Sequence, residues 1–156
     1  MRVVNIVALS GSLRATSTNT ALLREIAARA PDGVFVELFP IGELPLFNPD
    51  LEADLPDAAA HFRAVISASA ALIIASPEYA HGISGVLKNA LEWLVGCEGF
   101  AGKPVLVLNI APRAHHAIAA LRETLSTMAA RIVENPSVGA PCLYTLEEEL
   151  AHVAHS

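Results

Sequence analysis

Short apolar runs of strand length alternate along the chain with longer segments in which apolar residues recur at helical spacing. The runs predict strands at Val3–Leu9, Val34–Leu38, Ala71–Ala75 and Pro104–Ile110, and a weaker fifth strand at Ile132–Gly139, which contains Pro136. The longer segments predict helices at Asn19–Ala30, Asp57–Ala70, Val86–Val95, roughly His115–Arg131, and a short terminal one at Glu147–His155. Phe39–Pro56 has four prolines and little periodicity, so it predicts an irregular excursion.

Strands that are apolar throughout are buried on both faces of a sheet. With helices between them, such strands predict a parallel sheet joined by right-handed crossovers. Five units suit an α/β fold with a doubly wound, flavodoxin-like sheet in the order 2-1-3-4-5 and helices on both faces. In that architecture a ligand binds beyond the carboxyl ends of the strands, where the strand order reverses. The loops after strands one, three and four are therefore the candidate functional loops.

Composition narrows the class of protein. The 156 residues suit one domain, 1–156, and their 53% apolar and 17% charged content argues against disorder. A net charge of −6 argues against a nucleic-acid partner, and no apolar stretch reaches the ~18 residues of a membrane span. Cys97 and Cys142 form no Cys-x-x-Cys pair, so we expect no redox dithiol, no metal site and a reduced, cytoplasmic setting in which both thiols pack.

The loop after the first strand is rich in hydroxyl groups and contains one arginine. It reads Ser10-Gly11-Ser12-Leu13-Arg14-Ala15-Thr16-Ser17-Thr18-Asn19. Its backbone N–H groups, the start of the helix that follows, and the permanent charge of Arg14 together suit a phosphate ester. The alternative is an ordinary N-capping loop, but one cap needs one such residue rather than five hydroxyls and an arginine. We therefore favour phosphate binding at this loop.

The loop after the third strand reads Ser76-Pro77-Glu78-Tyr79-Ala80-His81-Gly82-Ile83-Ser84-Gly85. Pro77 stiffens the exit from the strand, and Gly82 and Gly85 leave backbone uncovered for a flat ligand. For Glu78 and Tyr79 a functional and a scaffold role both remain open. In the helix that follows, Trp93 is predicted to be a core residue.

The two loops together carry a resemblance. The first loop carries the motif Ser-Gly-Ser-Leu-Arg-x-x-Ser-x-Asn. Some sixty residues later follow Ser-Pro-Glu-Tyr and Gly-x-Leu-Lys-Asn-Ala-Leu-Glu-Trp-Leu. Together these motifs resemble the NADPH-dependent FMN reductase family, whose relatives include quinone, azo-dye and chromate reductases. The similarity runs from Val3 to about Val138. It implies non-covalently bound FMN, NADPH or NADH as co-substrate, and a homodimer or homotetramer with the helix after the second loop near the interface.

The resemblance also assigns roles within the two loops. Ser10, Ser12, Arg14, Ser17 and Asn19 would hold the phosphate, and Pro77, Glu78, Tyr79 and Ala80 would lie along the flavin ring, largely through backbone groups. Leu13, Thr18 and Gly82 are added as neighbours in the same loops. The predicted cofactor-binding residues are therefore Ser10, Ser12, Leu13, Arg14, Ser17, Thr18, Asn19, Pro77, Glu78, Tyr79, Ala80 and Gly82. No catalytic side chain is expected, because the flavin carries the chemistry.

Three function classes follow from these expectations. The first is an NAD(P)H-dependent reductase that passes electrons through FMN to a quinone-like or other small acceptor, or to free flavin. The second is a flavodoxin-type electron carrier without hydride chemistry, and the third a flavin-less binding protein of the same fold.

A small basic cluster follows the fourth strand and consists of Arg113, His115 and His116. One interpretation is that it attracts the phosphates of NADPH. The interpretation that we favour is that these are surface residues at a helix start.

Overall fold

The computed structural model describes residues 3–111, 113–134, 148 and 151. Five strands form one parallel sheet in the order β2-β1-β3-β4-β5, as predicted. The strands are β1 (Val4–Ser10), β2 (Val34–Leu38), β3 (Ala71–Ala75), β4 (Pro104–Leu108) and β5 (Arg131–Val133). The helices are α1 (Thr18–Ala28), α2 (Asp57–Ala68), α3 (Gly85–Val95) and α4 (His115–Thr127). None of these helices is long and apolar enough to cross a membrane.

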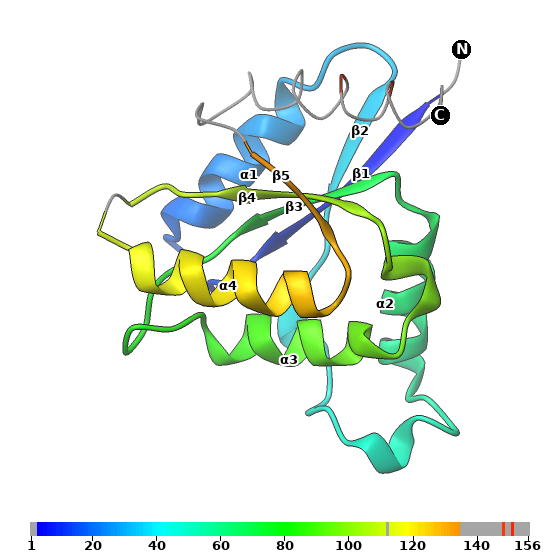
Figure 1. The fold of residues 1–156 in the computed structure, drawn as a ribbon. Coiled ribbons are helices and arrows are strands. Elements are labelled where there is room, and N and C mark those ends of the chain that lie inside the picture. Colours follow the sequence, from blue (N-terminus) through cyan, green and yellow to red (C-terminus); the bar gives the residue numbers. More distant parts are fainter. Residues whose placement is uncertain (1–2, 112, 135–147, 149–150, 152–156) are drawn as a thin grey trace.

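The sheet has a hydrophobic core on each face, which explains why its strands are apolar throughout. Alternate residues of β3 point to opposite sides: Leu72 and Ile74 pack with α2, α3 and α4, whereas Ile73 packs with α1. Figure 1 shows the same division, with α1 behind the sheet and α3 and α4 in front of it. The prediction of helices on both faces is therefore confirmed.

Three predicted helix ends were wrong. The second helix was predicted to reach Ala70 but α2 ends at Ala68, and the other two differences each have a local reason. The first helix was predicted to reach Ala30 but α1 ends at Ala28, because the residue before Pro31 is disfavoured in helical conformation. The fourth was predicted to reach Arg131 but α4 ends at Thr127. There Ala129 adopts a left-handed φ of 59°, and the Ala130 N–H donates to the Leu125 carbonyl over 3.0 Å. Glycine or asparagine is usual at such a helix-ending turn, so an alanine there could not be recognised as one from the sequence.

The excursion 39–56 is ordered by α3. It contains the 3-10 turns η1 (Ile41–Glu43) and η2 (Pro49–Leu51). The side chain of Asn89 accepts from the Phe47 N–H over 2.7 Å and donates to the Pro45 carbonyl over 3.0 Å. The indole N–H of Trp93 donates to the same carbonyl over 2.8 Å. Trp93 is fully buried, so its predicted core position is confirmed.

The remaining predicted features fall partly outside the described residues. β5 lies at an edge of the sheet, but its predicted extension to Gly139, with Pro136, lies outside them, as do Cys142 and almost all of Glu147–His155. Cys97 is buried and free, with its sulfur 3.4 Å from the Ser67 hydroxyl. This matches the packing role expected of that thiol.

Lys103 is buried between α2 and β4, and its stability contribution should depend on pH. The side chain is 8% exposed, and its ammonium donates to the Ser69 carbonyl. Burial lowers the pKa of Lys103 below its ordinary value of 10.5, opposed in part by Cys97. Between the lowered pKa and 10.5 the unfolded chain binds more protons, so the free energy of unfolding should rise with pH.

Urea unfolding of the wild type and of Lys103→Met across pH 7 to 10.5 tests this expectation. The wild type should gain stability relative to the variant as the pH approaches 10.5. A difference that stays constant or shrinks over that interval would contradict it.

Candidate functional site

Three loops meet at the carboxyl edge of β1, β3 and β4, as the topology requires (Figure 1). Ser10 pairs with Ala75 in the sheet register, and the Gly11 N–H donates to the Ala75 carbonyl over 2.8 Å. The loop after β3 reaches α4, since a carboxylate oxygen of Glu78 accepts from the Ala117 N–H over 2.7 Å. The structure thus brings the two predicted loops and the start of α4 together.

Gly11 lies where those first two loops touch. A Cβ built on it would lie 3.0 Å from Pro77 Cδ, 3.0 Å from Ser84 Oγ and 3.3 Å from Ser76 Cα. Its φ is not among the positive ones of the described glycines, Gly33 and Gly102. Glycine is needed here because the two loops approach each other closely.

The first loop combines capping with groups left available for a ligand. Ser17 caps α1, because its hydroxyl accepts from the Thr20 N–H over 3.2 Å, and the Ser10 and Thr20 hydroxyls lie 2.7 Å apart. The N-capping alternative is therefore correct for Ser17. Thr18 and Asn19 form the first turn of α1. The hydroxyl of Ser12 accepts from the Arg14 N–H over 3.3 Å.

The electrostatics of this loop favour an anion. The first turn of α1 contains no acidic residue, so the positive end of the helix dipole has no counter-charge within that turn. Arg14 is exposed, and among the described residues no carboxylate pairs with it. A phosphate group is stabilised by a cation and a helix start that have no other anion beside them.

The second loop forms a tight hairpin, residues 79–82. Tyr79 and Gly82 exchange backbone hydrogen bonds of 3.0 and 2.9 Å, and Tyr79 is 50% exposed. A Cβ on Gly82 would contact only the Tyr79 carbonyl, at 3.7 Å, so its outer side is open. The N–H groups of Ala80 and His81 bond to no acceptor in the part of the chain that the structure describes. The hairpin therefore offers backbone donors and an open surface, while the Glu78 side chain has a scaffold role.

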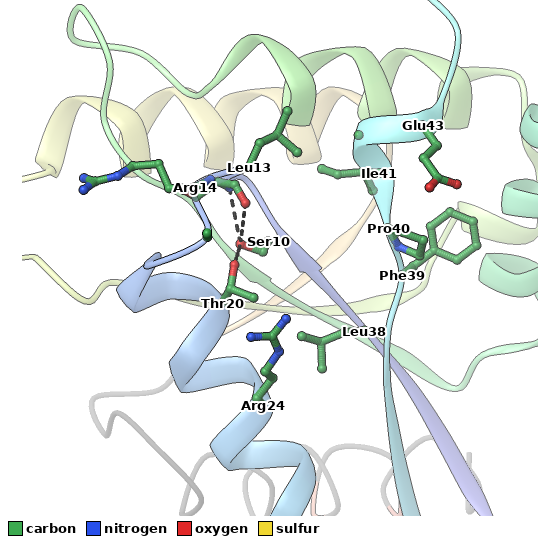
Figure 2. A pocket seen from close by; sticks show the side chains of 13 residues that line it. Ser10, Leu13, Arg14, Thr20, Arg24, Leu38, Phe39, Pro40, Ile41 and Glu43 are labelled. Carbon is green, nitrogen blue, oxygen red and sulfur yellow. Dashed lines mark hydrogen bonds between the residues drawn. The ribbon is translucent and has the colours of Figure 1, made fainter.

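A cavity of about 500 Å³ adjoins the first loop on the side of β2. Figure 2 shows Ser10, Arg14, Thr20 and Arg24 on the α1 side and an apolar wall opposite them. That wall consists of Leu38, Phe39, Pro40 and Ile41. Of the predicted residues, Ser10, Ser12, Leu13 and Arg14 line the cavity. Ser17, Thr18, Asn19 and the second-loop residues do not.

Sequence comparison places this geometry in a known family. Residues 4–143 match the sequence model of the NADPH-dependent FMN reductases. The chain belongs to this family. The predicted resemblance is thereby confirmed, and with it FMN and NAD(P)H as the cofactor and co-substrate of the family.

Individual relatives carry related names. The chain is 41% identical over 108 residues to an NAD(P)H-dependent FMN reductase of Pseudomonas aeruginosa, an alignment that covers 67% of this chain and 58% of the relative. It is 34% identical over 117 residues to a quinone reductase of Pseudomonas putida, covering 72% and 63%. The chain spans 48% to 63% of the length of the curated relatives it matches.

A solved structure supports the fold over nearly the whole chain. The flavoenzyme NAD(P)H:(acceptor) oxidoreductase FerB of Paracoccus denitrificans superposes with a TM-score of 0.79 at 26% identity, covering 96% of this chain and 94% of that one. The predicted flavodoxin-like architecture is thus confirmed.

Sequence reasoning missed three features near the site. It did not find that the Glu78 carboxylate reaches α4, that His81 stacks on His116, or that Arg24 lines the cavity. Helical spacing offered a signal only for Arg24, which lies one turn after Thr20 on α1. Among the described residues, no group of three or more histidine, cysteine or acidic side chains is placed to hold a metal ion.

Proposed function

We propose that this chain is an NAD(P)H-dependent reductase that passes electrons from the nicotinamide through bound FMN to a quinone-like or other small acceptor, or to free flavin. The observation that carries the proposal is the first loop, which approaches the second loop at Gly11. In this loop Arg14, which no carboxylate of the described residues pairs with, precedes a helix start without an acidic residue. The names of the relatives support the choice of acceptor.

In this proposal the first loop binds the phosphate of FMN. Arg14 supplies charge, Ser10 and Ser12 supply hydroxyls, and the first turn of α1, at Thr18 and Asn19, supplies N–H donors. Leu13 is 69% exposed and lies over Gly42, where a Cβ would come within 2.7 Å of it, so Leu13 links this loop to η1.

The second loop lies along the ring in the same proposal. Pro77 fixes the direction of the chain as it leaves β3. The N–H groups of Ala80 and His81, which have no acceptor among the described residues, suit the polar edge of a flavin. Gly82 lets the ring approach the backbone closely. When bound, FMN supplies the chemistry by accepting a hydride from the nicotinamide, so this chain has only to bind and orient.

A visible spectrum of the purified protein, before and after anaerobic addition of NADPH, tests the proposal. We expect a yellow protein that bleaches and then oxidises NADPH steadily when a quinone is added. A yellow protein that NADPH does not reduce would indicate the electron-carrier class. A colourless protein that takes up no added FMN would indicate the flavin-less class.

Arg14→Ala tests the phosphate site. Loss of one charge-assisted bond should weaken FMN binding by ~1–3 kcal/mol, or roughly 5- to 150-fold, measured by quenching of flavin fluorescence. Arg29→Ala is the matched control, because Arg29 follows the other end of α1 and pairs with Glu25 at 2.9 Å. If the Arg14 variant bound FMN as the control does, Arg14 would not belong to the site.

We also propose that residues 1–156 form one FMN-binding domain, that it assembles as a homodimer or homotetramer, and that it is cytoplasmic. The family resemblance supports the assembly, and the free thiol of buried Cys97 supports a reducing compartment. Light scattering on the FMN-loaded protein tests the assembly, which a monomeric mass would contradict.

A further inference from the structure

The hairpin 79–82 has an unusual backbone for its sequence. Its two central residues, Ala80 and His81, have left-handed φ values of 49° and 60°. The tight turns that join neighbouring strands in this way favour asparagine or glycine at both positions, because a Cβ is strained there. Such a conformation persists only where the surrounding structure holds it. Contacts outside the hairpin must therefore stabilise it.

Those contacts come from the first turn of α4. The His81 ring stacks on the His116 ring, with centroids 4.1 Å apart and planes 19° from parallel. His115 flanks His116 on α4, at a centroid distance of 4.1 Å and an angle of 37°. One residue before the hairpin, the Glu78 carboxylate accepts from the Ala117 N–H. The loop after β3 and the first turn of α4 are thus joined by a charged hydrogen bond and by stacked imidazoles.

The stack is not part of the hydrophobic core. All three histidines are exposed, and none belongs to either core cluster. The interpretation of His115 and His116 as surface residues at a helix start, favoured from the sequence, does not account for the stacking of His116 on His81. The contact joins the segment that the proposed function places along the flavin ring to the element that follows the neighbouring strand.

We propose that His81 and His116 are positioning residues, which hold the hairpin 79–82 in the conformation that receives the flavin ring. This role rests on the proposed function. It predicts a pH dependence, because two stacked imidazoles repel when both are protonated. The other titratable or charged groups on the joined segments are Glu78 and Tyr79 on one side and Arg113 and His115 on the other. Of these only Glu78 is an anion, and its carboxylate already accepts from α4.

Amide hydrogen exchange in the FMN-free protein tests the contact without any flavin. The reporter is the Gly82 N–H, which donates to the Tyr79 carbonyl. His116→Ala should speed its exchange about tenfold relative to the intrinsic rate, since the hairpin opens more often. His116→Phe, which keeps a ring and carries no charge, should restore slow exchange. His61→Ala, at an exposed histidine on α2, is the matched control and should change nothing.

FMN affinity, measured by fluorescence quenching at pH 7.5 and pH 5.5, tests the role. We expect His116→Ala to bind about tenfold more weakly at pH 7.5 and His116→Phe to bind as the wild type does. Between pH 7.5 and 5.5 the wild type should lose about fivefold more affinity than His116→Phe, a size typical of one exposed like-charge pair. The comparison at the same two pH values removes the titration of free FMN, which is common to both proteins.

The outcomes separate the two proposals. A wild type that takes up no FMN overturns the proposed function and, with it, this role of the stack. Normal FMN uptake by the wild type, together with unchanged Gly82 exchange and affinity in His116→Ala, overturns the role of the stack alone. An equal pH dependence in the wild type and His116→Phe also overturns it.

Discussion

Replacing Gly11 with valine should remove most FMN binding and destabilise the fold. A Cβ added at this position would lie 3.0 Å from Pro77 and from the hydroxyl of Ser84, and 3.3 Å from the backbone of Ser76. Ser84 caps α3, so it cannot move without loosening that helix. Overpacking of this kind costs ~1–3 kcal/mol of stability. Because the first loop would be pushed away from the second, FMN affinity should fall by at least ~100-fold, or about 2.7 kcal/mol.

Gly85→Val is the matched control for stability. Gly85 follows the same second loop at the start of α3, and a Cβ on it would meet no atom within 4 Å. Urea unfolding should therefore show a loss for Gly11→Val and little change for Gly85→Val. Equal midpoints for the two variants, with normal FMN loading of Gly11→Val, would show that the contact between the loops is dispensable.

Trp93→Ala should produce the largest loss of stability. The side chain is fully buried, its ring packs edge-on against Phe47 at 5.1 Å, and its N–H donates to the Pro45 carbonyl. Removing a buried aromatic side chain costs ~3–5 kcal/mol, a large share of the ~5–15 kcal/mol that a domain has. The excursion 39–56 would lose packing and one hydrogen bond together, so it should loosen first.

Trp93→Phe separates packing from hydrogen bonding. It keeps most of the ring, and the Pro45 carbonyl still accepts from Asn89, so the loss should be only ~1 kcal/mol. The unfolding midpoint in urea should fall by more than ~1 M for Trp93→Ala and by much less for Trp93→Phe. Circular dichroism is the suitable probe, because Trp93 is the one tryptophan of the chain. Similar midpoints for the two variants would contradict a packing role.

Much of the sheet could be predicted because its signals are local. β2 and β3 have the predicted bounds, Val34–Leu38 and Ala71–Ala75, since each is a short, mainly apolar run between residues that favour turns. The order of the strands followed from alternating strands and helices together with the handedness of crossovers. That order placed the candidate functional loops at one edge of the sheet before any contact was known. Family membership followed from two motifs in those loops.

Details of the candidate site could not be predicted, because they depend on residues distant in the sequence. The Glu78 carboxylate bonds to Ala117, 39 positions away, and the excursion 39–56 is held by Asn89, more than 40 positions from its partners. No periodicity encodes such pairs. The need for glycine at position 11 is of the same kind, since it arises from Pro77 and Ser84.

The sequence by itself determined the α/β class, the strand order, the two candidate loops and the family. It did so because burial patterns, helix signals and loop composition are properties of neighbouring residues. Only the tertiary structure decided that Glu78 supports α4, that α4 ends at a left-handed alanine, and that His81 stacks on His116. These features form when crossovers bring separate loops to one edge of the sheet, and short-range forces act only once that has happened.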